Sequence, residues 1–206
     1  MTLASAPDAV HSHSPFSIPH SRPMTDTPRL SDALKTAELL FDRATLDAQI
    51  HAMAARIDAD YAADAGDKPL FLTVMNGGMF FAAQLALAMR TELEFDYLHA
   101  TRYRGKTRGA GLNWLRHPQV PMLGRRVLLV DDILDEGQTL KAVREACRRE
   151  GASEVRIAVL TRKLHDRCVD GIEADYIGVE VPDRYVFGYG MDYYEQGRNV
   201  PAIYAL

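Results

Sequence analysis

Apolar residues gather along the chain in short unbroken runs that alternate with amphipathic stretches. The run at residues 126–130 (RVLLV) has no polar alternation after its first residue, which is typical of a strand buried on both faces of a parallel sheet. A helix is expected directly after Thr139, and another at residues 79–90. This alternation predicts a parallel α/β sheet flanked by helices. Further strands are predicted at residues 70–75, 94–100, 155–160, 175–181 and 186–189.

The first third of the chain has a different pattern. Residues 1–28 hold five of the ten prolines and little hydrophobic periodicity, which predicts a disordered N-terminal arm before a single domain at residues 29–206. Ser31 or Asp32 is expected to cap a short helix that runs to Leu40. A second, amphipathic helix is predicted by apolar residues at three- and four-residue spacing, namely Leu46, Ile50, Met53 and Ile57.

Composition excludes several classes of protein. The formal net charge of -4 argues against a broad basic face for nucleic acid, so a nucleic-acid partner is not expected. No apolar run approaches the about 18 residues of a membrane span. The two cysteines, Cys147 and Cys168, are too few for a disulfide framework and are interpreted as reduced thiols of a cytoplasmic protein.

Candidate chemistry lies where two predicted strands end. Asp131 and Asp132 follow the run at residues 126–130, at the carboxyl end of a strand, where open α/β sheets bind their ligands. Residues 135–139 (DEGQT) form a turn into a helix, whose N–H groups suit a phosphate. Residues 76–78 (NGG) form a similar turn, which from spacing alone is equally consistent with an ordinary tight turn.

A long polar segment follows the third predicted strand. Residues 101–118 (TRYRGKTRGAGLNWLRHP) are basic and rich in glycine, and a loop of this length is usually functional or disordered. Tyr103 and Trp114 lie among its basic residues, a combination that also occurs in proteins that bind single-stranded RNA.

Two stretches resemble one known family. Residues 130–140 (VDDILDEGQTL) resemble the PRPP-binding signature of the type I phosphoribosyltransferases, most closely the hypoxanthine-guanine branch, and residues 181–193 (VPDRYVFGYGMDY) are similar to its base-reading segment. The resemblance implies a parallel sheet with a flexible loop and a small C-terminal hood. It also implies purine salvage by Mg²⁺-dependent transfer of the 5-phosphoribosyl group from PRPP to a 6-oxopurine, giving IMP or GMP and pyrophosphate.

The resemblance also implies a role for each residue of the PRPP site. The 5-phosphate is expected at Glu136, Gly137, Gln138 and Thr139, and the ribose hydroxyls and Mg²⁺ at Asp131 and Asp132. Pyrophosphate is expected at Asn76, Gly77 and Arg198, and Tyr103 begins the mobile loop that covers the reaction centre. Asp135 is the expected acid/base for N7 of the purine, either as a proton acceptor or as an electrostatic stabiliser.

The base is expected against the C-terminal third of the chain. Lys163 corresponds to a lysine that donates to the exocyclic oxygen of a 6-oxopurine, a contact that rejects adenine. Tyr185 is expected to stack on the purine ring, and Val186 to meet the base edge through its backbone. Asp192 is expected to hold a second Mg²⁺ through waters.

Three positions depart from the family pattern, and alternatives to the salvage enzyme stay open. Asn76 stands where relatives often have a basic residue, Glu136 where many have threonine, and Gln138 where a basic residue is common. The Glu136 carboxylate would repel the phosphate and is expected to turn to solvent.

The alternatives to the salvage enzyme are a xanthine-preferring relative, an RNA-binding regulator on the same fold and a receiver-like signalling domain. The family further implies a homodimer or homotetramer.

Overall fold

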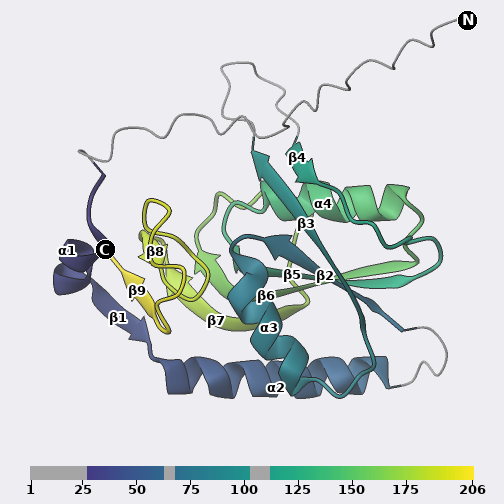
Figure 1. Cartoon of the computed structure of the whole chain (residues 1–206), viewed down its shortest axis with the longest axis horizontal. Coiled ribbons are helices and arrows are strands. Elements are labelled where there is room, and N and C mark those ends of the chain that lie inside the picture. The colour runs from purple at the N-terminus through teal and green to yellow at the C-terminus, as the bar shows by residue number, and fades with distance from the viewer. Residues whose placement is uncertain (1–26, 63–67, 103–111) are drawn as a thin grey trace, which may run out of the picture.

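The computed structural model describes residues 27–62, 68–102 and 112–206, and its centre is a six-stranded sheet (Figure 1). Five strands pair in parallel, and β4 joins the edge antiparallel to β3. The predicted fold class is confirmed. In the strand order β4-β3-β2-β5-β6-β7 the strands are β4 (Leu112–Arg116), β3 (Glu94–Arg102), β2 (Leu70–Met75), β5 (Arg126–Leu134), β6 (Glu154–Leu164) and β7 (Tyr176–Pro182).

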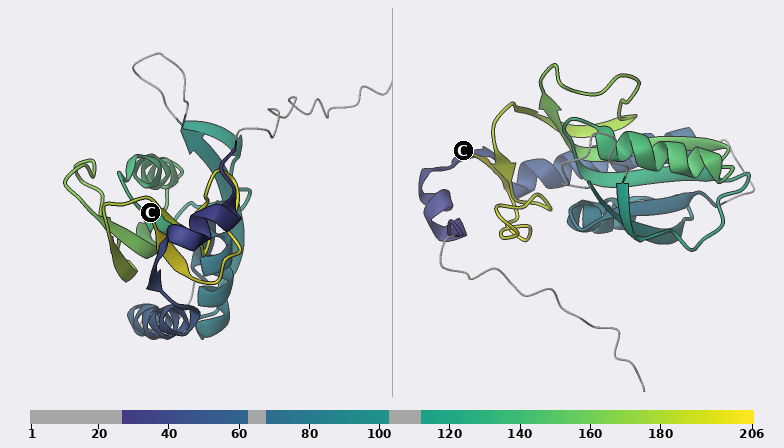
Figure 2. Two further views of the ribbon diagram at one scale, coloured as in Figure 1. Left: turned by 90° about the vertical axis from the view of Figure 1, so that its left-hand side faces the viewer. Right: turned by 90° about the horizontal axis from the view of Figure 1, so that it is seen from above.

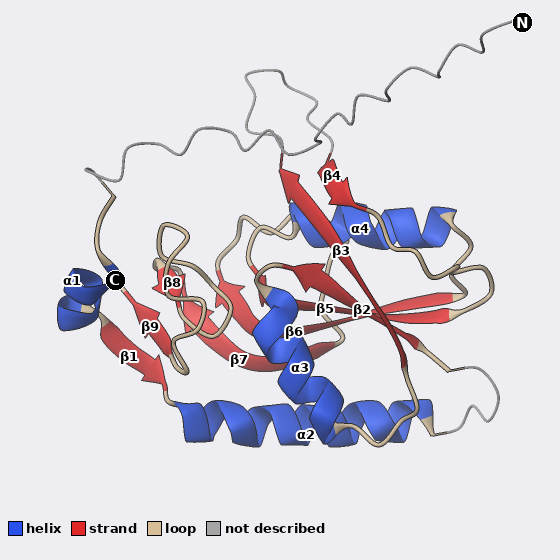
Figure 3. Cartoon of the chain, viewed as in Figure 1, coloured by secondary structure: helices blue, strands red, loops and turns tan. Residues whose placement is uncertain are grey.

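Helices cover both faces of this sheet (Figures 2 and 3). α2 (Arg43–Tyr61) and α3 (Gly78–Ala88) pack on one face, and α4 (Gln138–Arg149) packs on the other. Successive side chains of a strand point to opposite faces. Leu128 and Val130 of β5 therefore join the core under α2 and α3, while Val127 and Leu129 join the core under α4. This double burial is the reason why residues 126–130 are apolar without alternation.

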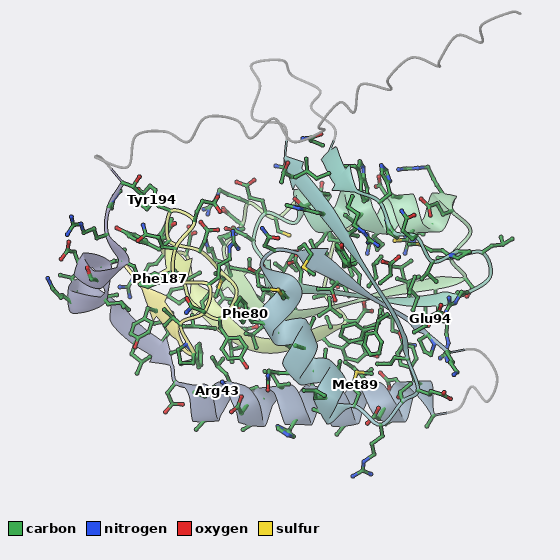
Figure 4. All side chains as sticks on the ribbon, viewed as in Figure 1. Arg43, Phe80, Met89, Glu94, Phe187 and Tyr194 are labelled. Atoms are coloured by element: carbon green, nitrogen blue, oxygen red, sulfur yellow. The ribbon has the colours of Figure 1, made fainter. Side chains whose placement is uncertain are left out.

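The hood is a second, three-stranded sheet in the order β1-β9-β8, built from both ends of the described chain. Its strands are β1 (Glu38–Phe41), β8 (Val186–Phe187) and β9 (Ile203–Ala205), and α1 (Leu30–Thr36) leads into β1. Both neighbours of β9 run antiparallel to it. In Figure 4, Phe187 and Tyr194 lie in this part of the molecule, at the opposite end from Glu94.

The prediction for the helix before α2 is wrong in two respects. The helix ends at Thr36, and residues 38–41 form β1, because these residues pair with β9. The residue at the N-cap is Arg29, which makes no side-chain capping bond, and Asp32 lies in the first turn. The second helix is confirmed, with the predicted stripe buried and Asp42 accepting from the Thr45 N–H at 2.9 Å.

Other boundaries also differ from the prediction. β5 continues through Asp131 and Asp132 to Leu134, because it stays paired with β6 up to Arg162. β6 continues to Leu164, because its last residues pair with β7. The segment at residues 101–118 is not a continuous loop, since β3 runs to Arg102 and β4 pairs with it. Tyr103 lies outside the described residues, as do residues 1–26 of the predicted arm. None of the described helices is long and apolar enough to cross a membrane.

Candidate active site

A cavity of about 340 Å³ opens at the carboxyl ends of β2 and β5. Its wall includes the turn after β2, the acidic end of β5, the turn into α4 and two residues from the hood, Glu195 and Arg198. The structure thus brings together most of the predicted PRPP-site residues, which are residues 76–77, 131–132, 135–139 and Arg198. Lys163, Tyr185, Val186 and Asp192 do not line this cavity, although Lys163 reaches Asp135 at its edge.

The turn into α4 forms one wall of the cavity. Gly137 is the N-cap of α4 and has a φ of +76°, a conformation that favours glycine. The N–H groups of the first helical turn follow it, at the positive end of the helix dipole. Gln138 Nε2 donates to the carboxylate of Glu136 at 3.1 Å, and Glu136 is partly buried, so its expected turn toward solvent is only partial. This wall has the form of an anion site.

The turn after β2 lies directly against the acidic end of β5. A Cβ atom at Gly77 would overlap the carboxylate of Asp132. The hood approaches the same point, because a Cβ at Gly190 would overlap the Gly77 carbonyl and lie 3.2 Å from Asp132 Cβ. Glycine at both positions lets three separate segments meet around Asp132.

Asp131 and Asp132 are both buried. The Asp132 N–H donates to Asp131 Oδ1 at 2.9 Å. Burial and then repulsion from Asp132 raise the pKa of Asp131 well above its ordinary value, and burial also raises the pKa of Asp132. Arg198 offsets this effect only in part for either carboxyl. Burial of the two carboxyls is therefore only partly offset by positive charge.

Asp135 has a different environment at the mouth of the same cavity. Lys163 Nζ donates to its Oδ2 at 2.8 Å, and His165 Nε2 lies 2.6 Å from its Oδ1. Burial favours the neutral acid, but the hydrogen bonds from Lys163 and His165 outweigh it and lower the pKa of Asp135. Asp135 is thus an ionised carboxylate with one donor on each oxygen.

The hood supplies the remaining predicted residues. Arg198 Nη2 pairs with Asp192 Oδ1 at 2.6 Å, and its Nη1 donates to the Gly190 carbonyl at 2.8 Å. The Tyr185 hydroxyl donates to the Asp192 carbonyl at 3.1 Å, and its ring is 46% exposed. Val186 is buried in β8 opposite Ala205. One hydrogen-bonded segment therefore carries Tyr185, Asp192 and Arg198.

Comparison with known proteins identifies the family. The sequence profile of the phosphoribosyl transferase domain matches residues 38–196, which is most of the chain. The chain belongs to the phosphoribosyltransferase family. Hypoxanthine-guanine phosphoribosyltransferase of Streptococcus pneumoniae is 38% identical over 152 residues, covering 73% of this chain and 82% of the relative. The enzyme of that name from Streptococcus thermophilus is 34% identical over 167 residues, covering 81% and 91%.

Solved phosphoribosyltransferase structures share the fold. A hypoxanthine phosphoribosyltransferase from Staphylococcus aureus superimposes with a TM-score of 0.74 at 30% identity, covering 82% of this chain and 90% of that one. A hypoxanthine-guanine phosphoribosyltransferase from Bacillus anthracis gives a TM-score of 0.75 at 27% identity, covering 82% and 98%. The resemblance inferred from residues 130–140 and 181–193 is confirmed.

The phosphoribosyltransferase site contains two residues that the sequence analysis missed. His165 contacts Asp135, and Glu195 lines the cavity beside Arg198. A signal for His165 was present, since residues two apart in an extended segment project to one side, as Lys163 does. Glu195 could not be found in this way, because it lies in an irregular turn with a φ of +65°.

Proposed function

We propose that this phosphoribosyltransferase transfers the 5-phosphoribosyl group of PRPP to hypoxanthine or guanine, giving IMP or GMP and pyrophosphate in purine salvage. The observation that carries the proposal is the ionised Asp135, held beside a phosphate-type turn by Lys163. An N7 proton acceptor, a donor for an exocyclic oxygen and an anion cradle are the three groups that this reaction needs.

Each group of PRPP is proposed to bind a different part of the cavity. Glu136, Gly137, Gln138 and Thr139 are proposed to hold the 5-phosphate through backbone N–H groups and the Thr139 hydroxyl. Asp131 and Asp132 are proposed to accept hydrogen bonds from the ribose hydroxyls, which would add donors to carboxyls whose pKa values burial has raised. The backbone after β2 at Asn76 and Gly77 is proposed to receive pyrophosphate.

Mg²⁺ is the proposed cofactor, and the donor set fits it. Mg²⁺ binds through one or two carboxylates and otherwise through waters and substrate phosphates. In accord with this, the described residues contain no cluster of three or more His, Cys, Asp and Glu side chains suited to a metal. Asp131, Asp132 and Asp192 are the residues proposed to hold it. When bound, the ion neutralises charge on the leaving pyrophosphate.

The ion pair of Asp192 and Arg198 connects two of the proposed roles. In the described arrangement each side chain neutralises the other at 2.6 Å. We propose that Arg198 moves to pyrophosphate as Asp192 turns to the water shell of Mg²⁺. Each charge then exchanges one partner for another, and neither is left buried and unpaired.

The base is proposed to bind between Asp135 and the hood. Lys163 would donate to the 6-oxo group, the exposed ring of Tyr185 would stack on the purine, and the Val186 backbone would meet the base edge. Asp135 would take or share the N7 proton while N9 attacks C1 of the ribose. The negative charge of Asp135 also suits an oxocarbenium-like transition state. Tyr103 is proposed to belong to the loop that covers this centre.

Three further proposals concern the whole molecule. We propose one domain at residues 29–206, supported by a fold that joins α1 at its start to β9 at its end, with residues 1–28 as an appended arm. A homodimer or homotetramer is proposed by analogy with the family. A cytoplasmic location is proposed because Cys147 and Cys168 are both free thiols.

A turnover assay with PRPP and Mg²⁺ tests the proposed function. Pyrophosphate release is followed with hypoxanthine, guanine, xanthine, adenine and uracil as separate acceptors. We expect turnover with hypoxanthine and guanine and none with adenine or uracil. A strong preference for xanthine would assign the xanthine branch instead, and no turnover with any base would overturn the proposal.

A further inference from the structure

His165 is buried against the carboxylate proposed to act on the purine. Its side chain is only 2% exposed, and its Nε2 lies 2.6 Å from Asp135 Oδ1. The residue follows directly after β6, two positions beyond Lys163. Both side chains therefore project from one extended segment toward the end of β5, the neighbouring parallel strand.

The second nitrogen of the ring fixes its hydrogen-bonding state. The backbone N–H of Arg167 donates to His165 Nδ1 at 3.0 Å. A nitrogen that accepts a hydrogen bond carries no proton, so the proton of the neutral ring lies on Nε2. His165 is therefore a neutral N–H donor aimed at Asp135, and it cannot gain a second proton without losing the Arg167 contact.

Arg167, which contacts this ring, is itself held by an ion pair. The guanidinium of Arg167 makes two bonds of 2.7 Å to the carboxylate of Asp183, just after β7. Asp183 lies two residues before Tyr185, which is proposed to stack on the base. A continuous set of contacts thus runs from the start of the base-reading segment through Arg167 and His165 to Asp135.

Lys163 and His165 hold the two oxygens of Asp135 in different ways. Lys163 has a long flexible stem and three donors, and in the proposed function its ammonium is needed at the exocyclic oxygen of the base. His165 is rigid, buried and already committed at both ring nitrogens. Oδ2 is thus the oxygen that becomes available when Lys163 turns to the base, while Oδ1 stays occupied.

We propose that His165 is a positioning residue for the phosphoribosyl transfer, which holds Oδ1 of Asp135 so that Oδ2 faces N7 of the purine. This inference rests on the proposed function. The N7 proton passes to Oδ2, and the electron pair of the N7–H bond stays with the purine. N9 bonds to C1 as the C1–O bond to pyrophosphate breaks, and the electron pair of that bond leaves with pyrophosphate. His165 keeps its own proton throughout, because the Oδ1 of a protonated carboxyl still accepts its hydrogen bond.

Three substitutions of His165 separate its two nitrogens. His165→Gln keeps an N–H donor near the position of Nε2, while His165→Asn offers an acceptor near Nδ1 but does not reach Asp135. His165→Leu removes both contacts. The matched control is His51→Leu, which removes an exposed histidine of α2 that contacts the backbone carbonyl of Asp47.

The expected result is a loss confined to turnover. In His165→Leu and His165→Asn we expect kcat with hypoxanthine to fall about tenfold, the effect of removing one hydrogen bond to a charged group. KM for PRPP should stay at the wild-type value, and His165→Gln should recover most of kcat. Equal kcat in the Gln, Asn and Leu variants, whether low or wild-type, would overturn the inference.

A spectroscopic measurement on the wild-type protein covers the case in which the variants do not fold. Nitrogen-15 NMR of the histidine rings is expected to show the neutral His165 ring with its proton on Nε2. A proton on Nδ1 would contradict the proposed contacts. Inactivity of the wild-type protein with every base removes the proposed function, whereas an active wild type with fully active His165→Leu removes this inference alone.

Discussion

The acidic end of β5 contains two carboxylate environments within five residues, and they differ in almost every respect. Asp131 and Asp132 are buried, face each other and have raised pKa values. Asp135 is 40% exposed, yet it has a cationic donor on one oxygen, an imidazole at the other and a lowered pKa. Deeper burial raises the pKa of Asp131 and Asp132, whereas the hydrogen bonds from Lys163 and His165 outweigh burial at Asp135 and keep it ionised.

This difference corresponds to two kinds of task. A buried acidic pair whose charge is only partly offset favours a ligand that brings hydroxyl groups and positive charge, so binding of such a ligand lowers the cost of ionising the pair. A carboxylate already held on both oxygens is oriented before substrate arrives, which suits a group that must meet one atom of the base. Each of the following substitutions changes one side of this comparison.

The largest effect is expected at the preorganised carboxylate. Asp135→Asn keeps the shape of the side chain but cannot take a proton, so kcat should fall on the order of 10²- to 10⁴-fold. PRPP should still bind with wild-type affinity, because the buried pair is untouched. Steady-state kinetics and calorimetric titration with PRPP measure the two quantities, and unchanged turnover would remove Asp135 from the chemistry.

Lys163→Ala removes one of the two donors to Asp135 and the proposed contact with the base. We expect kcat/KM for hypoxanthine to fall about 10- to 100-fold, as for a lost hydrogen bond with a charged partner. Lys68→Ala is the control, since Lys68 forms an exposed ion pair with Glu92 away from the cavity. Full activity of Lys163→Ala would show that another residue binds the exocyclic oxygen.

Gly77→Ala disturbs the buried pair, Asp131 and Asp132. The new Cβ would overlap the Asp132 carboxylate and force it away from its position in the cavity wall. KM for PRPP should rise about tenfold or more, since a displacement of about 1 Å at a binding group can cost on the order of 10²-fold. Gly124→Ala serves as the control for backbone strain without overlap, because Gly124 has a φ of +73° and its Cβ would have no atom within 4 Å. Equal KM values in the two variants would contradict the proposed role of Asp132.

The smallest effects are expected in stability, and they have opposite signs. The pKa of Asp131 is higher in the folded than in the unfolded state, so ionising it costs stability as the pH rises through that interval. The pKa of Asp135 is lower in the folded than in the unfolded state. Its ionised carboxylate therefore stabilises the fold above the unfolded-state pKa, and this stabilisation is lost as the pH falls through the folded-state pKa.

At neutral pH, Asp131→Asn should therefore raise the melting temperature and Asp135→Asn should lower it. A change of about 1 kcal/mol corresponds to about 2–4 °C for a domain of this size. Thermal unfolding of the ligand-free protein at pH 7 and at pH 4 measures both, and the gain for Asp131→Asn should shrink at the lower pH. Shifts of the same sign at pH 7 would show that the two environments do not differ as described.

The parts that could be predicted are those whose pattern is local. α2 was found from its apolar stripe, and β2 and β5 from unbroken apolar runs, because burial on one or two faces leaves a periodic trace in the sequence. The turn at residues 135–139 was also predicted from local sequence, because its glycine indicates a turn and its acidic residues indicate the chemistry.

The remaining features depend on partners that are distant along the chain. β1 was mistaken for the end of a helix because its strand conformation comes from pairing with β9, which has only three residues of its own. The contact between His165 and Asp135 arises because β5 and β6 stay paired beyond their apolar parts. The spacing of Lys163 and His165 indicates a shared side but not the partner that they contact, and β1 leaves no local signal, because register between strands is a property of the assembled sheet.

The hood also has a consequence for how the protein gains activity during folding. Its central strand, β9, must meet β1, which is nearly a whole chain length away, so closing this sheet carries a large loop-closure cost. The parallel sheet can form its pairs over shorter separations, and contacts between distant segments are the slow ones. Tyr185 and Val186 take their places only when β8 joins β9. In refolding, secondary structure and burial should therefore return before enzymatic activity, with the base-reading segment ordered last.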